Sequence, residues 1–261
     1  MPSKDKSLHI EPIKAFTDNY IWAIVNETNK SLWVVDPGEA KPVIDYIAKH
    51  NLNLCGILIT HHHYDHCGGV AELRQKYNIP VYGPGHSDIL ATDVVTDRQK
   101  IFLPECNLSF EVLAIPGHTL EHIAYYCAQE HLLFCGDTLF SAGCGRVFEG
   151  TQQQMVDSLM TLASLPDDTL AYCAHEYTLK NLQFAKQVEP KNEDIVRHLA
   201  FVSSLGHNPS VPTTLALEKK INPFLRTDVA TVIAAAEAQI GQPLATAVNV
   251  FSAIREWKNN F

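Results

Sequence analysis

One short segment, Thr60-His61-His62-His63-Tyr64-Asp65-His66, constrains the fold of this chain more than any other. It follows Leu54–Ile59, an apolar run with the length and β-branched content of a buried strand. His61 and His63 point the same way if the backbone stays extended, whereas Asp65 and His66 diverge only if it turns. Imidazole and carboxylate suit zinc, manganese or iron, so the segment predicts a catalytic metal site at a strand end. The alternative is a solvated histidine-rich loop, which would need neither the aspartate nor the strand.

Length, charge and cysteine usage narrow the class of protein. The 261 residues, 46% hydrophobic and 19% charged, allow one large domain or two modest ones with a sizeable core. No apolar run approaches the roughly 18 residues of a membrane helix, and Met1–Lys6 leads into no signal-peptide core. The seven cysteines are scattered and never spaced C-x-x-C, so we expect reduced, mostly buried thiols in the cytoplasm. The net charge of -9, without a basic cluster, argues against a nucleic-acid partner. We expect a monomer that acts on a small-molecule substrate and has no membrane partner.

Three more candidate ligands follow predicted strands. Strands over 109–115, 131–135 and 169–174 end just before His118, Asp137 and His175. Any one of these side chains would more often be a capping or core residue. Catalytic groups gather on loops at one edge of a scaffold, so the recurrence predicts that all three join the histidine segment in one site.

The remaining pattern predicts a mixed first part and a helical second part. Short β-rich runs over 8–14, 20–26 and 31–36 indicate an antiparallel meander, and helical spacing covers 40–50 and 70–77. Thr151 and Gln154 form a capping-box pattern that opens a helix ending at Ala163. Beyond residue 172 five helical patterns follow without a strand signal, over 181–187, 193–205, 213–219, 228–238 and 244–258. We therefore place a domain boundary there.

These motifs together resemble a known family. The segment Thr60–His66, with Gly117-His118-Thr119, Gly136-Asp137 and His175, is similar to the full ligand set of the metallo-β-lactamase superfamily. Three later motifs resemble the hydroxyacylglutathione hydrolases (glyoxalase II) more narrowly: Ser141-Ala142-Gly143-Cys144-Gly145-Arg146-x-Phe148-Glu149-Gly150-Thr151, His175-Glu176-Tyr177-Thr178 and Asn222-Pro223-Phe224-Leu225-Arg226. The resemblance runs from about Tyr20 to the C-terminus.

The resemblance implies a fold and a metal centre. The fold would be α+β, an αββα sandwich of two mixed β-sheets flanked by helices over residues 1–172, the catalytic domain. A smaller all-α substrate-binding domain would span 173–261. Two divalent metal ions would be bound, zinc first, with iron or manganese as alternatives. One ion would be held by His61, His63 and His118, the other by Asp65, His66 and His175, with Asp137 bridging them; Asp65 and Asp137 would also be catalytic.

It also implies a reaction. S-Lactoylglutathione and related 2-hydroxyacylglutathiones would be hydrolysed to the 2-hydroxy acid and glutathione by a hydroxide between the metals, the second step of methylglyoxal detoxification. A thiolate leaves readily, because the pKa of the corresponding thiol is about 8.5. No histidine acid outside the ligand set is therefore needed.

The resemblance places the glutathione thioester against five side chains: Arg146, Phe148, Tyr177, Arg255 and Lys258. Arg255 and Lys258 are three residues apart, so they lie on one face of a helix and could pair with the carboxylates of glutathione. Alternatively, their positive charges offset the dipole at the helix C-terminus. Eukaryotic relatives often carry Lys and Tyr in place of Arg146 and Phe148, and the family's usual Asp after the last Lys is Asn259 here, so we expect altered affinity but the same reaction.

Other polar residues carry plainer expectations. Asp36 is either a turn residue, which the pattern favours, or, with Thr60, a support for the histidine rings, as the resemblance implies. Glu176 is expected to anchor backbone of the helical part. His62 should point away from its neighbours, and seven more histidines are expected at the surface or at caps: His9, His50, His86, His122, His131, His198 and His207.

Three other functions stay open. A persulfide dioxygenase of the same superfamily would use one iron at His61, His118 and Asp137, but this chain keeps the second-metal residues and a long helical tail. A superfamily nuclease would need basic surface. A binding module without chemistry would need no open coordination position.

Overall fold

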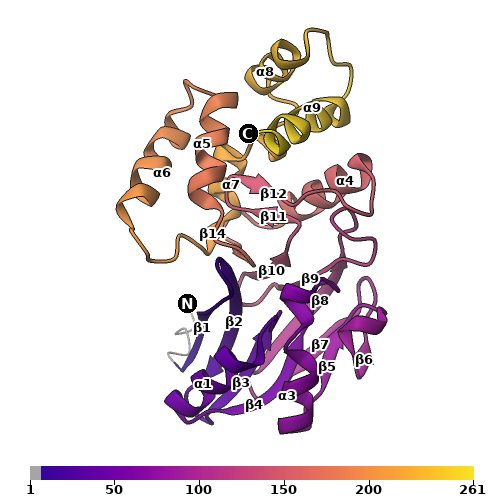
Figure 1. The fold of residues 1–261 in the computed structure, drawn as a ribbon, viewed down its shortest axis with the longest axis vertical. Coiled ribbons are helices and arrows are strands. Elements are labelled where there is room, and N and C mark those ends of the chain that lie inside the picture. The colour runs from indigo at the N-terminus through magenta and orange to yellow at the C-terminus, as the bar shows by residue number, and fades with distance from the viewer. Residues whose placement is uncertain (1–6) are drawn as a thin grey trace. The chain divides into compact units, whose positions relative to one another are not determined.

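The computed structural model describes residues 7–261 (Figure 1). The first six residues, which led into no signal-peptide core, lie outside the described part. Contacts divide the chain into two compact units. Unit 1 comprises Met1–Ala114 and Glu121–Gly136, and unit 2 comprises Ile115–Leu120 and Asp137–Phe261.

Unit 1 contains a six-stranded mixed sheet. Its strands, in spatial order, are β1 Leu8–Ala15, β2 Asn19–Asn26, β3 Ser31–Val35, β4 Asn53–Leu58, β5 Val81–Gly83 and β6 Asp93–Val94. The first three pair antiparallel, which confirms the predicted meander, and β3 to β6 pair parallel. All five residues of β3 are buried, as expected of a strand covered on both faces.

Two helices cover one face of this sheet. They are α1 Ala40–His50 and α3 Val70–Tyr77, both with the predicted bounds. Val43 and Leu73 from these helices share a buried cluster with Ile21 and Val34 from the sheet. The short helix α2 Tyr64–Cys67 and the 3-10 turn η1 Ser87–Ile89 complete the helical elements described in unit 1.

A second sheet packs on the first, and four of its six strands lie in unit 1. They are β7 Lys100–Leu103, β8 Leu108–Ala114, β9 Ile123–Cys127 and β10 Leu132–Gly136, and they pair antiparallel in chain order. The hydroxyl of Tyr125 on β9 lies 2.9 Å from the carbonyl of Ile59 and 3.1 Å from that of Tyr82, so it joins the two sheets. The sequence did not predict β7, because the strand has only four residues and its exposed position Phe102 is apolar, so no polar–apolar alternation marks it.

Unit 2 is mainly helical (Figure 1). Its helices are α4 Gln152–Ala163, α5 Thr178–Val188, α6 Glu193–Ser204, α7 Leu215–Ile221, α8 Ala230–Ile240 and α9 Ala247–Asn259, with the 3-10 turn η2 Pro223–Leu225. Two antiparallel strand pairs accompany them. β11 Leu139–Phe140 and β12 Gly143–Cys144 form a separate two-stranded sheet, whereas β13 Leu170–Cys173 and β14 Thr213–Thr214 belong to the second six-stranded sheet.

The helix-start signals in unit 2 have different outcomes. The capping box of Thr151 and Gln154 is confirmed, with both reciprocal hydrogen bonds formed. The helix expected from residue 213 instead begins at Leu215, because residues 213 and 214 pair with β13 and the Thr214 hydroxyl accepts a hydrogen bond from the Leu217 amide. Strand pairing displaced the helix start by two residues.

The predicted α+β fold with a helical C-terminal part is confirmed. The boundary at residue 172 remains a prediction. Among residues 7–261, no helix is both long enough and apolar enough to cross a membrane. All seven cysteines lie in this range, where no disulfide is formed and only Cys55 is not fully buried.

Candidate metal and substrate site

The histidine segment in unit 1 lies between a strand and a short helix. The chain leaves β4 at Leu58 and enters α2 at Tyr64. His61 is buried, and its Nε2 lies 3.2 Å from Nδ1 of His63. Its other ring nitrogen lies 3.1 Å from the Thr60 hydroxyl. The two imidazoles therefore direct nitrogens to one point, as the extended spacing predicts.

Asp36 holds this segment from the end of β3. Its carboxylate accepts hydrogen bonds from the Thr60 amide at 2.8 Å and the Thr60 hydroxyl at 2.7 Å. The same carboxylate lies 3.0 Å from His66 Nδ1, and His66 Nε2 lies 3.5 Å from Asp65 Oδ2. Asp36 also has a φ of 53°, the left-handed conformation of a turn. Both interpretations of Asp36 therefore hold, and its carboxylate fixes the orientation of His66.

One histidine was misjudged from the sequence. His122 is fully buried, and its ring stacks on His61 with centroids 4.6 Å apart, so the expectation of a surface or capping residue is wrong. The next amide, Ile123, donates to the Thr60 carbonyl at 3.0 Å and brings the start of β9 beside the segment. A side chain at position 136 would approach the Thr60 hydroxyl to 2.4 Å, so Gly136 leaves room for this packing. No local signal marks a contact that the strand order creates.

The structure agrees with the expectations for His62, His86 and Glu176. His62 turns away from His61 and stacks on His86, with centroids 3.9 Å apart. His86 caps η1 by accepting from the Asp88 amide, as expected. Glu176 accepts from the Ser210 amide at 2.8 Å, which confirms its predicted role as a backbone anchor.

Unit 2 brings three predicted ligands together. The carboxylate of Asp137 lies 3.5 Å from His118 Nε2 through Oδ2 and 3.3 Å from His175 Nε2 through Oδ1. His118 Nδ1 lies 2.8 Å from the Arg146 carbonyl, which fixes the imidazole. A Cβ at position 145 would lie 1.9 Å from the Asp137 carbonyl, so Gly145 permits this close approach. The three side chains are buried, and each histidine turns Nε2 to the central carboxylate.

Aromatic rings surround His175. The ring of Tyr177 stacks on it with centroids 4.7 Å apart and planes at 8°, and Phe140 meets it edge-on at 5.8 Å. Phe148 approaches His118 at 5.3 Å between centroids but is 62% exposed. An exposed aromatic side chain beside a buried histidine suits contact with a ligand.

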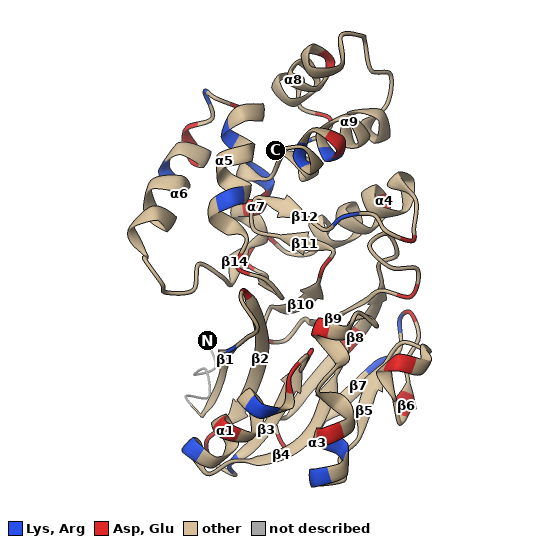
Figure 2. Ribbon diagram, viewed as in Figure 1, with Lys and Arg blue, Asp and Glu red and all other residues tan. Residues whose placement is uncertain are grey.

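A cavity of about 460 Å³ in unit 2 is lined by all five residues expected to bind substrate. His118 and Asp137 line it too. The sequence did not single out the other lining residues as contacts: Phe140, Cys144, Gly145, Lys180, Asn181, Asn259 and Phe261. Figure 2 shows cationic residues on α5 and α9, which contribute to this lining.

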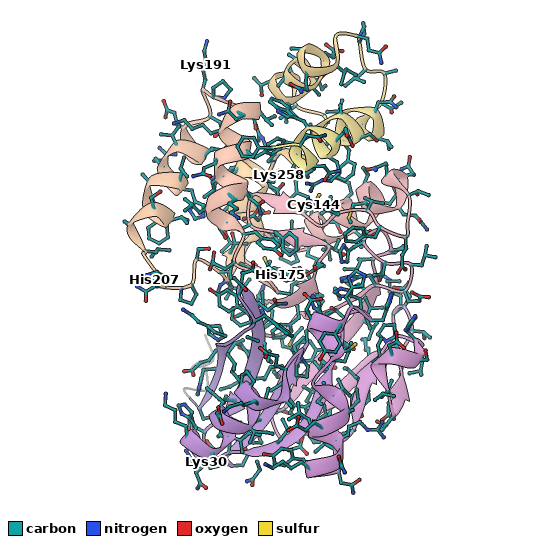
Figure 3. All side chains as sticks on the ribbon, in the orientation of Figure 1. Lys30, Cys144, His175, Lys191, His207 and Lys258 are labelled. Carbon is teal, nitrogen blue, oxygen red and sulfur yellow. The ribbon has the colours of Figure 1, made fainter. Side chains whose placement is uncertain are left out.

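The two cations of α9 are held firmly in this wall. Arg255 is buried, and its Nη1 donates to the Cys144 carbonyl at 2.9 Å. Figure 3 labels Cys144 and Lys258, which both line this cavity. The ammonium of Lys258 lies 5.1 Å from the centre of the Phe184 ring. Burial, followed by the charges of Arg255 and Lys180, lowers the pKa of Lys258 to about 8.

The donor sets of both units fit divalent metal ions. Imidazole nitrogens and carboxylate oxygens are ligands for zinc, iron and manganese. In unit 1 His61 Nε2 lies 3.2 Å from His63 Nδ1, and His66 Nε2 lies 3.5 Å from Asp65 Oδ2, so two pairs of ligand atoms converge. The outer nitrogens of His61, His66 and His118 each lie near a protein oxygen, which leaves the inner nitrogen for an ion.

Comparisons with known proteins cover nearly the whole chain. A family model described as the metallo-beta-lactamase superfamily matches residues 16–175, and one described as hydroxyacylglutathione hydrolase C-terminus matches residues 176–261. The chain is 49% identical over 257 residues to a hydroxyacylglutathione hydrolase of Nitrosomonas eutropha, covering 97% of this chain and 99% of that protein. It is 49% identical over 260 residues to the protein of that name from Pseudomonas savastanoi pv. phaseolicola, covering 97% and 100%.

Solved structures share the fold at lower identity. ETHE1 from Myxococcus xanthus has a TM-score of 0.66 at 23% identity, covering 96% of this chain and 90% of that one. TTHA1623, solved in a di-iron-bound form, has a TM-score of 0.59 at 24% identity, covering 82% and 100%.

Proposed function

Because the chain belongs to the hydroxyacylglutathione hydrolase family of the metallo-β-lactamase superfamily, we propose that it hydrolyses S-lactoylglutathione and related 2-hydroxyacylglutathiones. The products are the 2-hydroxy acid and glutathione. The observation that carries this proposal is the cavity in unit 2, where Asp137 and His118 lie in one lining with four cationic side chains. A carboxylate–imidazole pair beside a cationic wall suits hydrolysis of an anionic thioester.

The proposed metal ligands are the seven residues of the family pattern. His61, His63 and His118 would hold one ion, Asp65, His66 and His175 the other, and Asp137 would bridge them. Divalent ions bound by such ligands provide hydroxide at neutral pH and stabilise the developing oxyanion. We propose zinc as the resident metal, with iron or manganese as alternatives.

Protein residues orient these ligands and the substrate. Asp36 and Thr60 set the rings of His66 and His61, and the Arg146 carbonyl sets that of His118. Phe148 and Tyr177 offer apolar surface to the thioester. Arg255 and Lys258 supply positive charge for a carboxylate of glutathione. The leaving thiolate needs no proton from the protein, because the pKa of the glutathione thiol in solution is about 8.5.

The other functions have less support. Relatives that align with 97% of the chain are named hydroxyacylglutathione hydrolase, which favours hydrolysis over persulfide oxidation by a single iron. The charge of -9 disfavours a nuclease. We further propose a cytoplasmic monomer, a location consistent with seven reduced cysteines.

Purified protein with two bound metals per chain provides the test. Its metal content is measured by mass spectrometry, and loss of the S-lactoylglutathione thioester is followed together with release of free thiol. We expect one thiol released per thioester lost. A protein carrying both metals that leaves the thioester intact contradicts the proposed function.

A further inference from the structure

The cavity carries more positive charge than one carboxylate requires. Four of its lining side chains are cationic: Arg146, Lys180, Arg255 and Lys258. The single acidic side chain in the lining is Asp137, which the proposed function assigns to metal binding. A wall of one sign concentrates anionic ligands, and here it opposes the net charge of -9 of the whole chain.

Two of these cations already have protein contacts. Arg255 donates to the Cys144 carbonyl at 2.9 Å and to the Asn259 amide oxygen at 3.2 Å. The Lys258 ammonium donates to the Lys180 backbone carbonyl at 3.3 Å. The Lys258 ammonium also lies over the rings of Phe184 and Phe261, and the Arg255 guanidinium over that of Phe224, so both charges are held in the α9 wall of the cavity.

Lys180 differs from that pair. It is exposed in the first turn of α5, a turn without an acidic residue, three positions after the Tyr177 ring that stacks on His175. Within residues 7–261, no hydrogen bond or ion pair engages its ammonium group. The side chain therefore adds a solvated charge to the cavity lining from α5, next to Lys258 of α9, whose pKa its charge helps to lower.

We infer that Lys180 binds a second carboxylate of the substrate and makes the enzyme selective for γ-glutamyl thioesters. This inference rests on the proposed function. Glutathione carries two carboxylates, one on its glycine and one on its γ-glutamyl group. Arg255 and Lys258 of α9 can pair with one of them, and Lys180 of α5 with the other. A thioester of N-acetylcysteinylglycine lacks the γ-glutamyl carboxylate and so gains nothing from Lys180.

Steady-state kinetics with two substrates test this assignment. The metal-loaded wild type, Lys180→Ala and Lys180→Glu are compared on S-lactoylglutathione and on the S-lactoyl thioester of N-acetylcysteinylglycine, whose blocked amine cannot capture the acyl group. For Lys180→Ala we expect KM for S-lactoylglutathione to rise roughly 2- to 5-fold, the range of an exposed ion pair, with kcat unchanged. Charge reversal should raise it about tenfold. KM for the N-acetylcysteinylglycine thioester should not change in Lys180→Ala.

Lys186→Ala is the matched control, because Lys186 is an exposed lysine in the last turn of the same helix and outside the cavity lining. We expect wild-type kinetics on both substrates. Equal KM increases on both thioesters in Lys180→Ala, or no increase in Lys180→Glu, would overturn the assignment.

A binding measurement separates this inference from the proposed function. If the wild type hydrolyses neither thioester, the proposed function fails, and calorimetry with S-methylglutathione and S-methylcysteinylglycine still tests Lys180. Selective weakening of S-methylglutathione in Lys180→Ala supports the inference. Unchanged affinity for both ligands overturns it.

Discussion

Asp137 is the residue on which the proposed centre depends most. Its two carboxylate oxygens lie 3.5 Å and 3.3 Å from the inner nitrogens of His118 and His175, which belong to different proposed metals. A shared carboxylate is what offsets the repulsion between two neighbouring divalent ions. Because its oxygens lie between two histidines, removing the Asp137 carboxylate should affect both proposed metal sites.

We expect Asp137→Ala to lose both metals together, with activity reduced by more than about 100-fold. His61→Ala should weaken chiefly one metal, since that histidine is assigned to a single ion. Metal content per chain, measured after dialysis at matched free zinc, distinguishes the two. If Asp137→Ala keeps as much metal as the wild type, the carboxylate is no bridge.

Lys258 leads to a pH prediction. With a pKa of about 8, the side chain is charged below that pH and neutral above it. An anionic thioester favours the charged form, so KM should rise as pH increases through about 8, while kcat stays level. The Cys144 thiol beside it, with a pKa raised to about 11, titrates above this window.

Profiles of kcat and KM from about pH 6.5 to 9.5, corrected for spontaneous thioester loss, check the prediction. Lys258→Ala should show a high KM that does not vary with pH. Lys258→Arg should keep a low KM to higher pH, because guanidinium stays protonated. A KM that is flat through pH 8 in the wild type would assign Lys258 to the helix dipole instead.

At the scale of elements, a buried carboxylate holds the β11–β12 hairpin in place. Glu218 of α7 is completely buried. One of its oxygens accepts from the hydroxyls of Ser141 and Thr213, at 2.9 Å and 2.8 Å. The other accepts from the Ala142 amide at 2.8 Å and from the Asn222 side-chain amide at 3.1 Å. This network fixes the turn before Cys144, which lines the substrate cavity.

Hydroxyls surround one oxygen of the Glu218 carboxylate and N–H donors the other, so Glu218→Gln and Glu218→Ala should lower the free energy of unfolding by different amounts. In Glu218→Gln the amide nitrogen can face the hydroxyls, which can rotate and accept, while the oxygen keeps the two N–H donors. Removing a buried charge whose pKa is already raised by desolvation also favours the amide. We expect Glu218→Gln to change the free energy of unfolding by less than about 1 kcal/mol.

Glu218→Ala should cost about 3 to 5 kcal/mol, because it removes the acceptor of the Ala142 amide and of the Ser141 and Thr213 hydroxyls and opens a cavity. Urea denaturation of both variants at matched metal content gives the comparison. Equal stability of the two variants would show that the network does not hold the hairpin.

The sequence predicted most elements because their signals are local. Helices α1 and α3 have the predicted bounds, and strands precede His118, Asp137 and His175 as expected. Glu218 shows where local signals end: between Leu217 and two lysines it has the pattern of a solvent-facing helix position. Its burial follows from the approach of the turn at Ser141, 77 residues earlier.

The substrate wall shows the same limit. Arg255 and Lys258 could be assigned from their motif, whereas Lys180 and Asn259 line the cavity only because α5 and α9 turn those faces to it. His122 was misplaced for a related reason, since β9 brings it to His61 by strand order. Side chains at strand ends were predictable, and contacts made by tertiary packing were not.

At the scale of the whole molecule, the proposed ligands come from both compact units. The segment from His61 to His66 belongs to unit 1, while His118, Asp137 and His175 belong to unit 2. The family models also meet within this chain, between residues 175 and 176, close to the predicted boundary at residue 172. If metals bind as proposed, their binding energy contributes to the stability of the native chain as a whole.

Metal removal should therefore lower thermal stability as well as activity. An ion at 100 times its dissociation constant stabilises the native state by about 2.7 kcal/mol. For a chain of this size, 1 kcal/mol shifts Tm by roughly 2 to 4 °C, so one vacated site predicts a fall of about 5 to 10 °C. Chelated and zinc-restored protein are compared by scanning calorimetry, with Asp137→Ala as the control that should respond little. An unchanged Tm in protein shown to have lost its metal would mean that the ions are not coupled to folding.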